Sequence, residues 1–219
     1  MNENCLYKDV CTNECTSGCV RYNSMKALLD KSGLPVHLQR EKTLIAYEED
    51  ISSFQRLAEI KSEIMNFVIL AKNLYIYSDT CGNGKTSWSI KLMLAYFDKV
   101  WSQCGFDCKG YFIHTPTLLT RLKAFDTGFS LSDEERSRLL NADLVIWDDI
   151  ASTKLSEFDH TMLLTYLDQR INKGLSNIFT GNCGEDECYT NLGGRLHSRV
   201  WTMSERIELR EFDKRGLRE

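Results

Sequence analysis

Short apolar runs alternate with amphipathic segments over most of the chain, and the two patterns predict strands and helices in turn. The apolar runs predict strands at residues 74–78, 110–115, 143–150, 176–182 and 206–212. Apolar positions at helical spacing predict helices at residues 50–70, 85–101, 117–124 and 156–173. Strands and helices that alternate in this way predict an α/β fold, in which a parallel sheet carries helices on both faces.

Residue types at the ends of these segments support the predicted limits of the helices. Asp50 suits the N-cap of the helix that follows it. Ser156 and Asp159 have the spacing of a capping box, and Gly174 is a typical helix stop. A shorter amphipathic piece at residues 25–35 precedes these elements.

Length and charge narrow the class of protein. The chain has 219 residues, enough for one core domain and a small appendage. Its net charge is −4, so charge alone does not predict nonspecific binding to duplex DNA, although it leaves room for a local basic groove. The amino terminus is polar, and the longest apolar run, residues 67–71, is far too short to cross a bilayer. These features predict a cytoplasmic protein with no membrane partner.

The first 45 residues differ from the rest in their cysteines, so we expect a small module at residues 1–45 and a larger domain at residues 46–219. Four of the nine cysteines lie within this module, namely Cys5, Cys11, Cys15 and Cys19. Four thiolates can close a tetrahedral zinc site that folds a small core. The spacing is not the paired C-x2-C pattern, so an iron–sulfur cluster and free thiols remain as alternatives.

A glycine-rich turn between a predicted strand and a predicted helix indicates a phosphate site. Gly84, Lys85 and Thr86 match the end of the P-loop pattern G-x-x-x-x-G-K-[ST], whereas Asp79 stands at its first glycine. Lys85 is expected to reach the β- and γ-phosphates of ATP, and Thr86 to place its hydroxyl on Mg²⁺. Backbone N–H groups at the start of a helix can surround a phosphate. The residues expected to bind the nucleotide are Gly82, Asn83, Gly84, Lys85, Thr86 and Ser87.

Two acids and an asparagine follow the third and fourth predicted strands. Apolar residues 144–147 run directly into Asp148 and Asp149. We expect Asp148 to hold Mg²⁺, directly or through water, and Asp149 to polarise the attacking water. Glutamate is the more usual residue at the second position, so Asp149 predicts slow hydrolysis. Asn182 stands where side chains line the ligand crevice of doubly wound sheets and could orient water, or it could simply belong to a turn.

Two arginines distinguish between classes of P-loop protein. Arg195 and Arg199 are four residues apart, so they would share one face of a helix. A small-molecule kinase uses arginines to clamp its own acceptor. An oligomeric ATPase presents an arginine to the γ-phosphate in the neighbouring subunit.

The ordered set of motifs resembles the DnaC/DnaI-type AAA+ helicase loaders and the related IstB transposition helpers. In that family an L-G-x-R-x-x-[SD]-R segment follows the strand that carries the asparagine, and a later strand ends in D-x-R. Residues 192–199 and 213–215 match these segments here, and the resemblance covers roughly residues 45–219.

This resemblance implies a P-loop AAA+ ATPase that loads a DnaB-type replicative helicase onto single-stranded DNA and self-associates through its ATP site. It implies the role of a trans-acting finger for Arg199 or for its partner Arg195, and a late, sensor-like role for Arg215. It also implies that residues 1–45 form a helicase-binding module, in some relatives a zinc-containing one. Asp79 and Asp149 depart from the family pattern and bear on turnover more than on nucleotide binding.

Three other functions are compatible with these motifs. An IstB-like helper would act on a transposase, and a P-loop kinase would phosphorylate a small molecule. A zinc-containing DNA-binding regulator would not hydrolyse ATP. Oligomerisation that depends on ATP and on Arg199 separates the loader and the helper from the kinase, and turnover separates them from the regulator.

Overall fold

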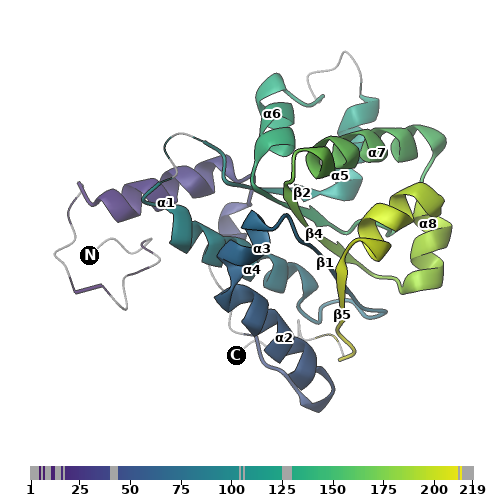
Figure 1. Ribbon diagram of the computed structural model, residues 1–219, viewed down its shortest axis with the longest axis horizontal. Coiled ribbons are helices and arrows are strands. Elements are labelled where there is room, and N and C mark those ends of the chain that lie inside the picture. Colours follow the sequence, from purple (N-terminus) through teal and green to yellow (C-terminus); the bar gives the residue numbers. More distant parts are fainter. Residues whose placement is uncertain are drawn as a thin grey trace.

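The computed structural model describes residues 5, 7, 11, 12, 16, 18–39, 44–103, 105, 107–124, 130–211 and 213. Figure 1 shows a central sheet with helices on both sides. The strands are β1 (Asn73–Tyr77), β2 (Gly110–His114), β3 (Leu144–Asp148), β4 (Ser176–Gly181) and β5 (Glu205–Glu208). The helices are α1 (Val20–Lys31), α2 (Ile51–Ser62), α3 (Ile64–Ile69), α4 (Lys85–Val100), α5 (Thr115–Lys123), α6 (Asp133–Asn141), α7 (Glu157–Asn172) and α8 (Glu185–His197). Shorter pieces are the 3-10 turns η1 (Val36–Leu38) and η2 (Glu48–Asp50) and the π-helix η3 (Ser198–Thr202).

The five strands are parallel and lie in the order β2-β3-β4-β1-β5. In this order β4 separates β1, which leads into the glycine loop, from β3, which ends in the acids. Tyr77 pairs with Gly181 and Trp147 with Phe179, so the carboxyl ends of the three strands meet at one edge. That edge is where ligands bind in open parallel sheets.

Alternate strand residues belong to two hydrophobic clusters, one on each face of the sheet. Leu74, Ile76 and Ile178 pack in the cluster formed with α1, α2, α3 and α4. Tyr75 and Phe179 pack in the cluster formed with α5, α6, α7 and α8. Strands covered on both faces need apolar side chains in both directions. This requirement explains the continuous apolar runs in the sequence.

Helix α1 covers the outer edge of the sheet. Its following residue, Ser32, accepts a hydrogen bond from the Phe112 backbone N–H at 2.7 Å, which occupies a donor on edge strand β2. Met25 and Leu28 of α1 lie in the same cluster as α4. The part of the predicted 1–45 module that the structure describes from residue 18 onward therefore packs on the larger domain. The division at residues 45 and 46 itself stays a prediction.

One predicted helix was wrong, and helix α6 was missed. The single helix expected at residues 50–70 is broken at Glu63, whose φ of −102° and ψ of 23° separate α2 from α3. Helix α6 was not predicted, because its sequence is almost entirely polar and buries only Leu139. A capping box between Ser132 and Glu135 starts this helix.

None of the helices in the described part of the chain combines the length and the apolar run that crossing a bilayer requires.

Candidate nucleotide site

The loop between β1 and α4 has the backbone shape of a phosphate cradle. Gly82 and Gly84 adopt φ values of +77° and +109°, a region that side chains with a Cβ rarely enter. Gly84 is the N-cap of α4, and Lys85 and Thr86 form the first turn of this 16-residue helix. The loop thus delivers backbone N–H groups to a helix amino terminus, where anions bind. Ser87 follows in the same turn.

Side chains of the loop bind one another. Asn83 is fully buried, and its side-chain amide donates to Ser78 Oγ and, at 3.2 Å, to Thr80 Oγ1. Lys85 Nζ donates to the Thr80 carbonyl at 2.7 Å and to Asn83 Oδ1 at 3.3 Å. Asn83 therefore shapes the loop from inside. Lys85 has polar partners within the loop and lies 8% exposed.

The segment after β5 crosses this loop. The Leu209 carbonyl accepts from the Asn83 amide at 3.1 Å, and the Glu211 carbonyl accepts from the Thr80 hydroxyl at 2.7 Å. The Asp213 carboxylate lies so close to Gly82 that a Cβ at that glycine would meet Asp213 Oδ1 at 1.8 Å. Gly82 is therefore required both for its backbone conformation and for this close approach.

Asp148 joins the glycine loop to the sheet. It is 8% exposed, and its Oδ1 accepts hydrogen bonds from the hydroxyls of Thr86 and Thr180, each at 2.8 Å. Burial raises the pKa of Asp148 above its usual range, against the lowering effect of these two hydroxyls. The charge interaction with His114 also lowers this pKa, and burial outweighs all three effects. Thr86 and Asp148, the predicted Mg²⁺ ligands, are brought together.

The structure also brings Asp149 and Asn182 together. Asn182 Nδ2 donates to Asp149 Oδ1 at 3.0 Å, and the Asp149 backbone N–H donates to Thr180 Oγ1 at 2.9 Å. Asp149 has a φ of 59°, an uncommon conformation for a residue with a side chain, so it is held against local strain. His114 Nε2 lies 4.0 Å from Asp149 Oδ2.

Sequence patterns alone did not predict a function for Thr180 or for His114. Thr180 lies within the strand predicted at residues 176–182, and the four histidines show no ligand spacing among themselves. Their place at the carboxyl ends of β4 and β2 is the signal that could have found them.

These residues fit ATP and Mg²⁺. The left-handed Gly82 and Gly84 give the loop the backbone shape of a phosphate cradle, and Lys85 supplies a positive charge at the loop. Thr86 and Asp148 supply a hydroxyl and a carboxylate, which are oxygen ligands of the kind that Mg²⁺ takes. The raised pKa of the buried Asp148 indicates a carboxylate that a cation would stabilise.

The two candidate finger residues lie beyond a kink in α8. Gly193 breaks the helix with φ 72° and ψ 160°, and Arg195 follows with an exposed side chain. Arg199 lies on η3 and forms an ion pair with Asp168 of α7, with Nε 2.7 Å from Oδ1. Among the contacts of the described residues, Arg199 is paired with α7 and with neither acid of its own site.

Two predicted site residues, Arg215 and one of the four cysteines, lie outside the described residues. Arg215 belongs to the predicted nucleotide site. The cysteine outside the described residues is Cys15, whereas Cys5, Cys11 and Cys19 are described and carry free thiols. Within the described ranges no three His, Cys, Asp or Glu residues are arranged to hold a metal ion. The zinc site of four cysteines is therefore not confirmed and stays a prediction.

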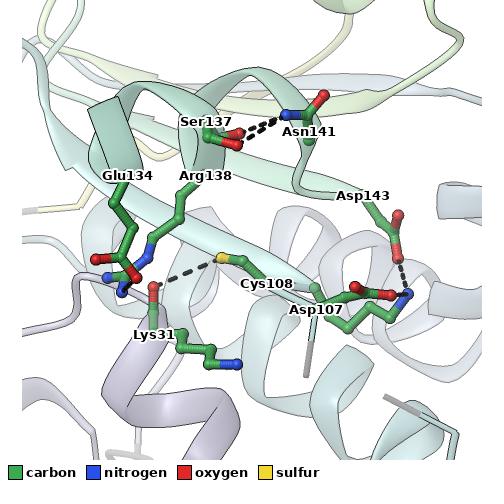
Figure 2. Close-up of a pocket in the computed structure, with 9 residues that line it drawn as sticks. Lys31, Asp107, Cys108, Glu134, Ser137, Arg138, Asn141 and Asp143 are labelled. Atoms are coloured by element: carbon green, nitrogen blue, oxygen red, sulfur yellow. Dashed lines mark hydrogen bonds and ion pairs between the residues drawn. The ribbon is translucent and has the colours of Figure 1, made fainter. Parts of the chain in front are cut away.

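A polar pocket of about 400 Å³ lies at the opposite end of the sheet, near the start of β2 and β3 (Figure 2). Its lining residues are Lys31, Asp107, Cys108, Lys109, Glu134, Ser137, Arg138, Asn141 and Asp143. Lys109 lies 3.5 Å from both Asp107 and Asp143, and Arg138 pairs with Glu134 at 2.5 Å. None of the residues predicted to bind nucleotide lines this pocket.

Comparison with solved structures agrees with the fold. The DnaC helicase loader matches with a TM-score of 0.59 and 23% identity, over 75% of this chain and 93% of that chain. A putative primosome component from Streptococcus pyogenes matches with a TM-score of 0.60 and 21% identity, over 86% and 98%. The replication initiator DnaA bound to AMPPCP and single-stranded DNA matches with a TM-score of 0.57 and 16% identity, over 76% of this chain and 48% of that chain.

These likenesses confirm the predicted α/β fold, in which a parallel sheet carries helices on both faces. No protein-family model matches the sequence. No curated protein matches it either. At such identities the likeness shows the fold, and the function is argued from the site.

Proposed function

We propose that this protein is an ATP-dependent loader that places a DnaB-type replicative helicase on single-stranded DNA. The observation that carries the proposal is the continuous hydrogen-bonded set at the carboxyl edge of the sheet. It runs from Thr86 through Asp148 and Thr180 to Asp149 and Asn182. The fold shared with a helicase loader supports this choice over a small-molecule kinase.

The loop binds the phosphates and α4 orients them. Backbone N–H groups of residues 82–86 face the phosphates, and Lys85 leaves the Thr80 carbonyl to pair with the γ-phosphate. Thr86 and Asp148 would hold Mg²⁺, which when bound neutralises charge on the phosphate oxygens. Asp148 then keeps its charged form in spite of burial, because a neighbouring cation favours it.

Asp149 and Asn182 act on the attacking water. Asp149 accepts a proton or polarises the water, and Asn182 fixes the Asp149 carboxylate by its 3.0 Å hydrogen bond. An aspartate reaches less far than a glutamate by one methylene. Slow turnover follows from this shorter side chain, and slow turnover suits a switch that changes an assembly once per cycle.

The arginine that completes the site comes from a neighbouring subunit. Arg199 is bound to Asp168 of its own chain and to neither Asp148 nor Asp149. We therefore assign it to the γ-phosphate of an adjacent copy, where it stabilises transition-state charge. Self-association then depends on ATP, and hydrolysis loosens the interface that releases the loaded helicase.

The amino-terminal residues are assigned to helicase binding, with zinc as the metal of the four cysteines. Tyr7 Oη donates to Asp98 Oδ1 at 2.7 Å, and Arg21 pairs with the same oxygen at 2.7 Å. Asp98 lies near the end of α4, the helix that begins in the glycine loop. A helicase bound at the amino terminus is thereby joined mechanically to the nucleotide site.

Co-purification with a replicative helicase from the same source tests the proposal. Size-exclusion chromatography with light scattering would compare the mixture with and without ATP and Mg²⁺. We expect a stable complex that Lys85→Ala or Arg199→Ala alters and that Lys109→Ala, in the opposite pocket, leaves intact. A protein that stays monomeric and binds no helicase under any nucleotide would refute the loader.

A further inference from the structure

The two candidate finger arginines differ in how they are held, and the difference identifies a further residue. Arg199 Nε donates to Asp168 Oδ1 at 2.7 Å, and its Nη2 lies 3.5 Å from Asp168 Oδ2. Its Nη1 donates to the Arg195 carbonyl at 3.4 Å. Among the contacts of the described residues, Arg195 takes part in this group through its backbone carbonyl, and its side chain is exposed. We infer that Asp168 is a positioning residue that holds Arg199, rather than Arg195, as the trans-acting finger, an inference that rests on the proposed function.

The chemistry of the guanidinium makes this arrangement useful. Arginine carries five N–H donors in one plane. Asp168 takes the edge formed by Nε and Nη2, which fixes the plane of the group. One N–H on Nη1 and one on Nη2 remain for the other edge, and this pair matches two oxygens of a phosphate. The carboxylate therefore orients the group without using the donors that a γ-phosphate needs.

The backbone places Arg199 where α7 can reach it. The break at Gly193 and the π-helix η3 interrupt the regular turn of α8, and π-helical turns are frequent at functional sites. Helices α7 and α8 lie side by side (Figure 1), and Arg199, on the η3 turn that directly follows α8, reaches Asp168 of α7. An arginine held by a carboxylate loses less freedom when it binds than one with an exposed, unrestrained side chain.

The alternative is an ordinary surface ion pair. The side chains of Arg199 and Asp168 are 31% and 39% exposed, so the pair contributes little to stability. A role in orientation predicts something different: loss of Asp168 weakens the finger that one subunit gives to another and leaves folding unchanged. The test must therefore measure how well Arg199 of one subunit supports ATP turnover in a neighbouring subunit.

Mixed variants isolate that effect. A Lys85→Ala subunit cannot use its own site but still offers Arg199, and an Arg199→Ala subunit keeps its site but lacks the finger. Their mixture is expected to regain ATP turnover that neither has alone. With Lys85→Ala/Asp168→Asn as the donor, we expect roughly tenfold less regained turnover, and with Lys85→Ala/Asp168→Ala a larger loss, because the arginine remains but its orientation is lost. Asp168→Asn is isosteric and keeps the test available if Asp168→Ala does not fold.

Each control separates one explanation from another. A Lys85→Ala/Glu134→Gln donor, which breaks the distant Arg138 ion pair, should restore turnover in full. Full restoration by both Asp168 donors would overturn the inference and leave the trans-acting finger standing. Loss with a Lys85→Ala/Arg195→Ala donor, combined with full restoration by Asp168→Asn, would overturn it by assigning the finger to Arg195. No restoration in the first mixture would overturn the trans-acting finger itself.

Discussion

The two ends of the parallel sheet both gather charged side chains, but they treat them differently. At the carboxyl end, Asp148 is buried, its pKa is raised by burial, and its partners in the described structure are two neutral hydroxyls. At the amino end, Lys109 and Arg138 lie beside carboxylates that neutralise them.

This difference shows which cluster of polar residues is prepared for a ligand. When a cation binds to a desolvated carboxylate that lacks one, the charged form is stabilised. A carboxylate that is already in an ion pair is stabilised little by a further cation. In the pocket of Figure 2, the charges of Lys109 and Arg138 are thus already paired with carboxylates that line the same pocket. The candidate nucleotide site differs in holding a buried carboxylate, Asp148, whose hydrogen-bond partners in the described structure are neutral.

The largest effect on ATP turnover is expected when one lysine at each end of the sheet is replaced by alanine. Lys85→Ala removes the charge at the phosphate loop and should lower ATP turnover by roughly 100-fold or more, since charge at the transferred phosphate is lost. Lys109→Ala removes a lysine that pairs with Asp107 and Asp143 and should leave turnover unchanged. Steady-state phosphate release measures both. Equal losses in the two variants would abolish the distinction between the two ends.

A methyl group at the glycine loop should have the next largest effect. Gly82→Ala adds a Cβ at a φ of +77° and directly against Asp213, so the loop must shift. We expect nucleotide affinity to fall by about 10- to 100-fold, in line with a backbone strain of order 1–3 kcal/mol. Titration with a fluorescent ATP analogue measures the change.

Two further variants separate the backbone strain from the clash with Asp213 as causes of that loss. Gly105→Ala carries a comparable positive φ of 53° with no atom of the described residues within 4 Å of its Cβ, and it should bind as the unmodified chain does. Gly82→Ala/Asp213→Ala removes the clash and keeps the backbone strain, so it should recover part of the affinity. Affinity that is unchanged in Gly82→Ala would mean that the loop does not hold phosphate in this conformation.

Comparison of the two ends also shows what the sequence could predict. The strands follow from apolar runs, and the glycine loop follows from Gly84, Lys85 and Thr86 beside a strand and a helix. Thr86 and Asp148 were expected at one site, but the hydrogen bond from Thr180 to Asp148 was not predicted, because it depends on β4 lying between β1 and β3. Alternation of strands and helices predicts a parallel sheet but leaves the strand order open.

The same reason explains the other omissions. Asp168 meets Arg199 across 31 residues of sequence, and nothing in the local pattern of α7 marks that aspartate. Apolar periodicity does not predict the polar helix α6, because Leu139 is the one residue that this helix buries. Packing between distant segments, which periodicity cannot report, decided each case.

A smaller effect, opposite in sign for stability and function, is expected at Asp148. Its pKa is raised in the folded state, so its contribution to stability is full below the pKa of the unfolded chain and is lost as the pH rises through the raised value. Asp148→Asn keeps an acceptor for Thr86 and Thr180 without the charge. At neutral pH and without nucleotide, we expect its Tm to rise by about 2–4 °C.

Scanning calorimetry across pH tests this sign. The gain in Tm of Asp148→Asn over the unmodified chain should shrink as the pH falls toward the acid range, where the carboxyl of the unmodified chain is protonated. Addition of ATP and Mg²⁺ should stabilise the unmodified chain and not the variant. A Tm that falls at neutral pH would show that Asp148 is already compensated, as the charges at the amino end are.

The smallest effect is expected at the amino end itself. Glu134→Gln removes the charge that pairs with Arg138, but the Glu134 side chain is 74% exposed and the pair lies one turn apart on α6. Exposed pairs of this kind contribute about 0.3–0.5 kcal/mol, so urea unfolding should shift by no more than that, and turnover should not change. A loss of more than about 2 kcal/mol would contradict this expectation, since no exposed pair of this kind reaches that value. The amino end would then hold a desolvated charge, and the pocket in Figure 2 would have to be treated as a binding site as well.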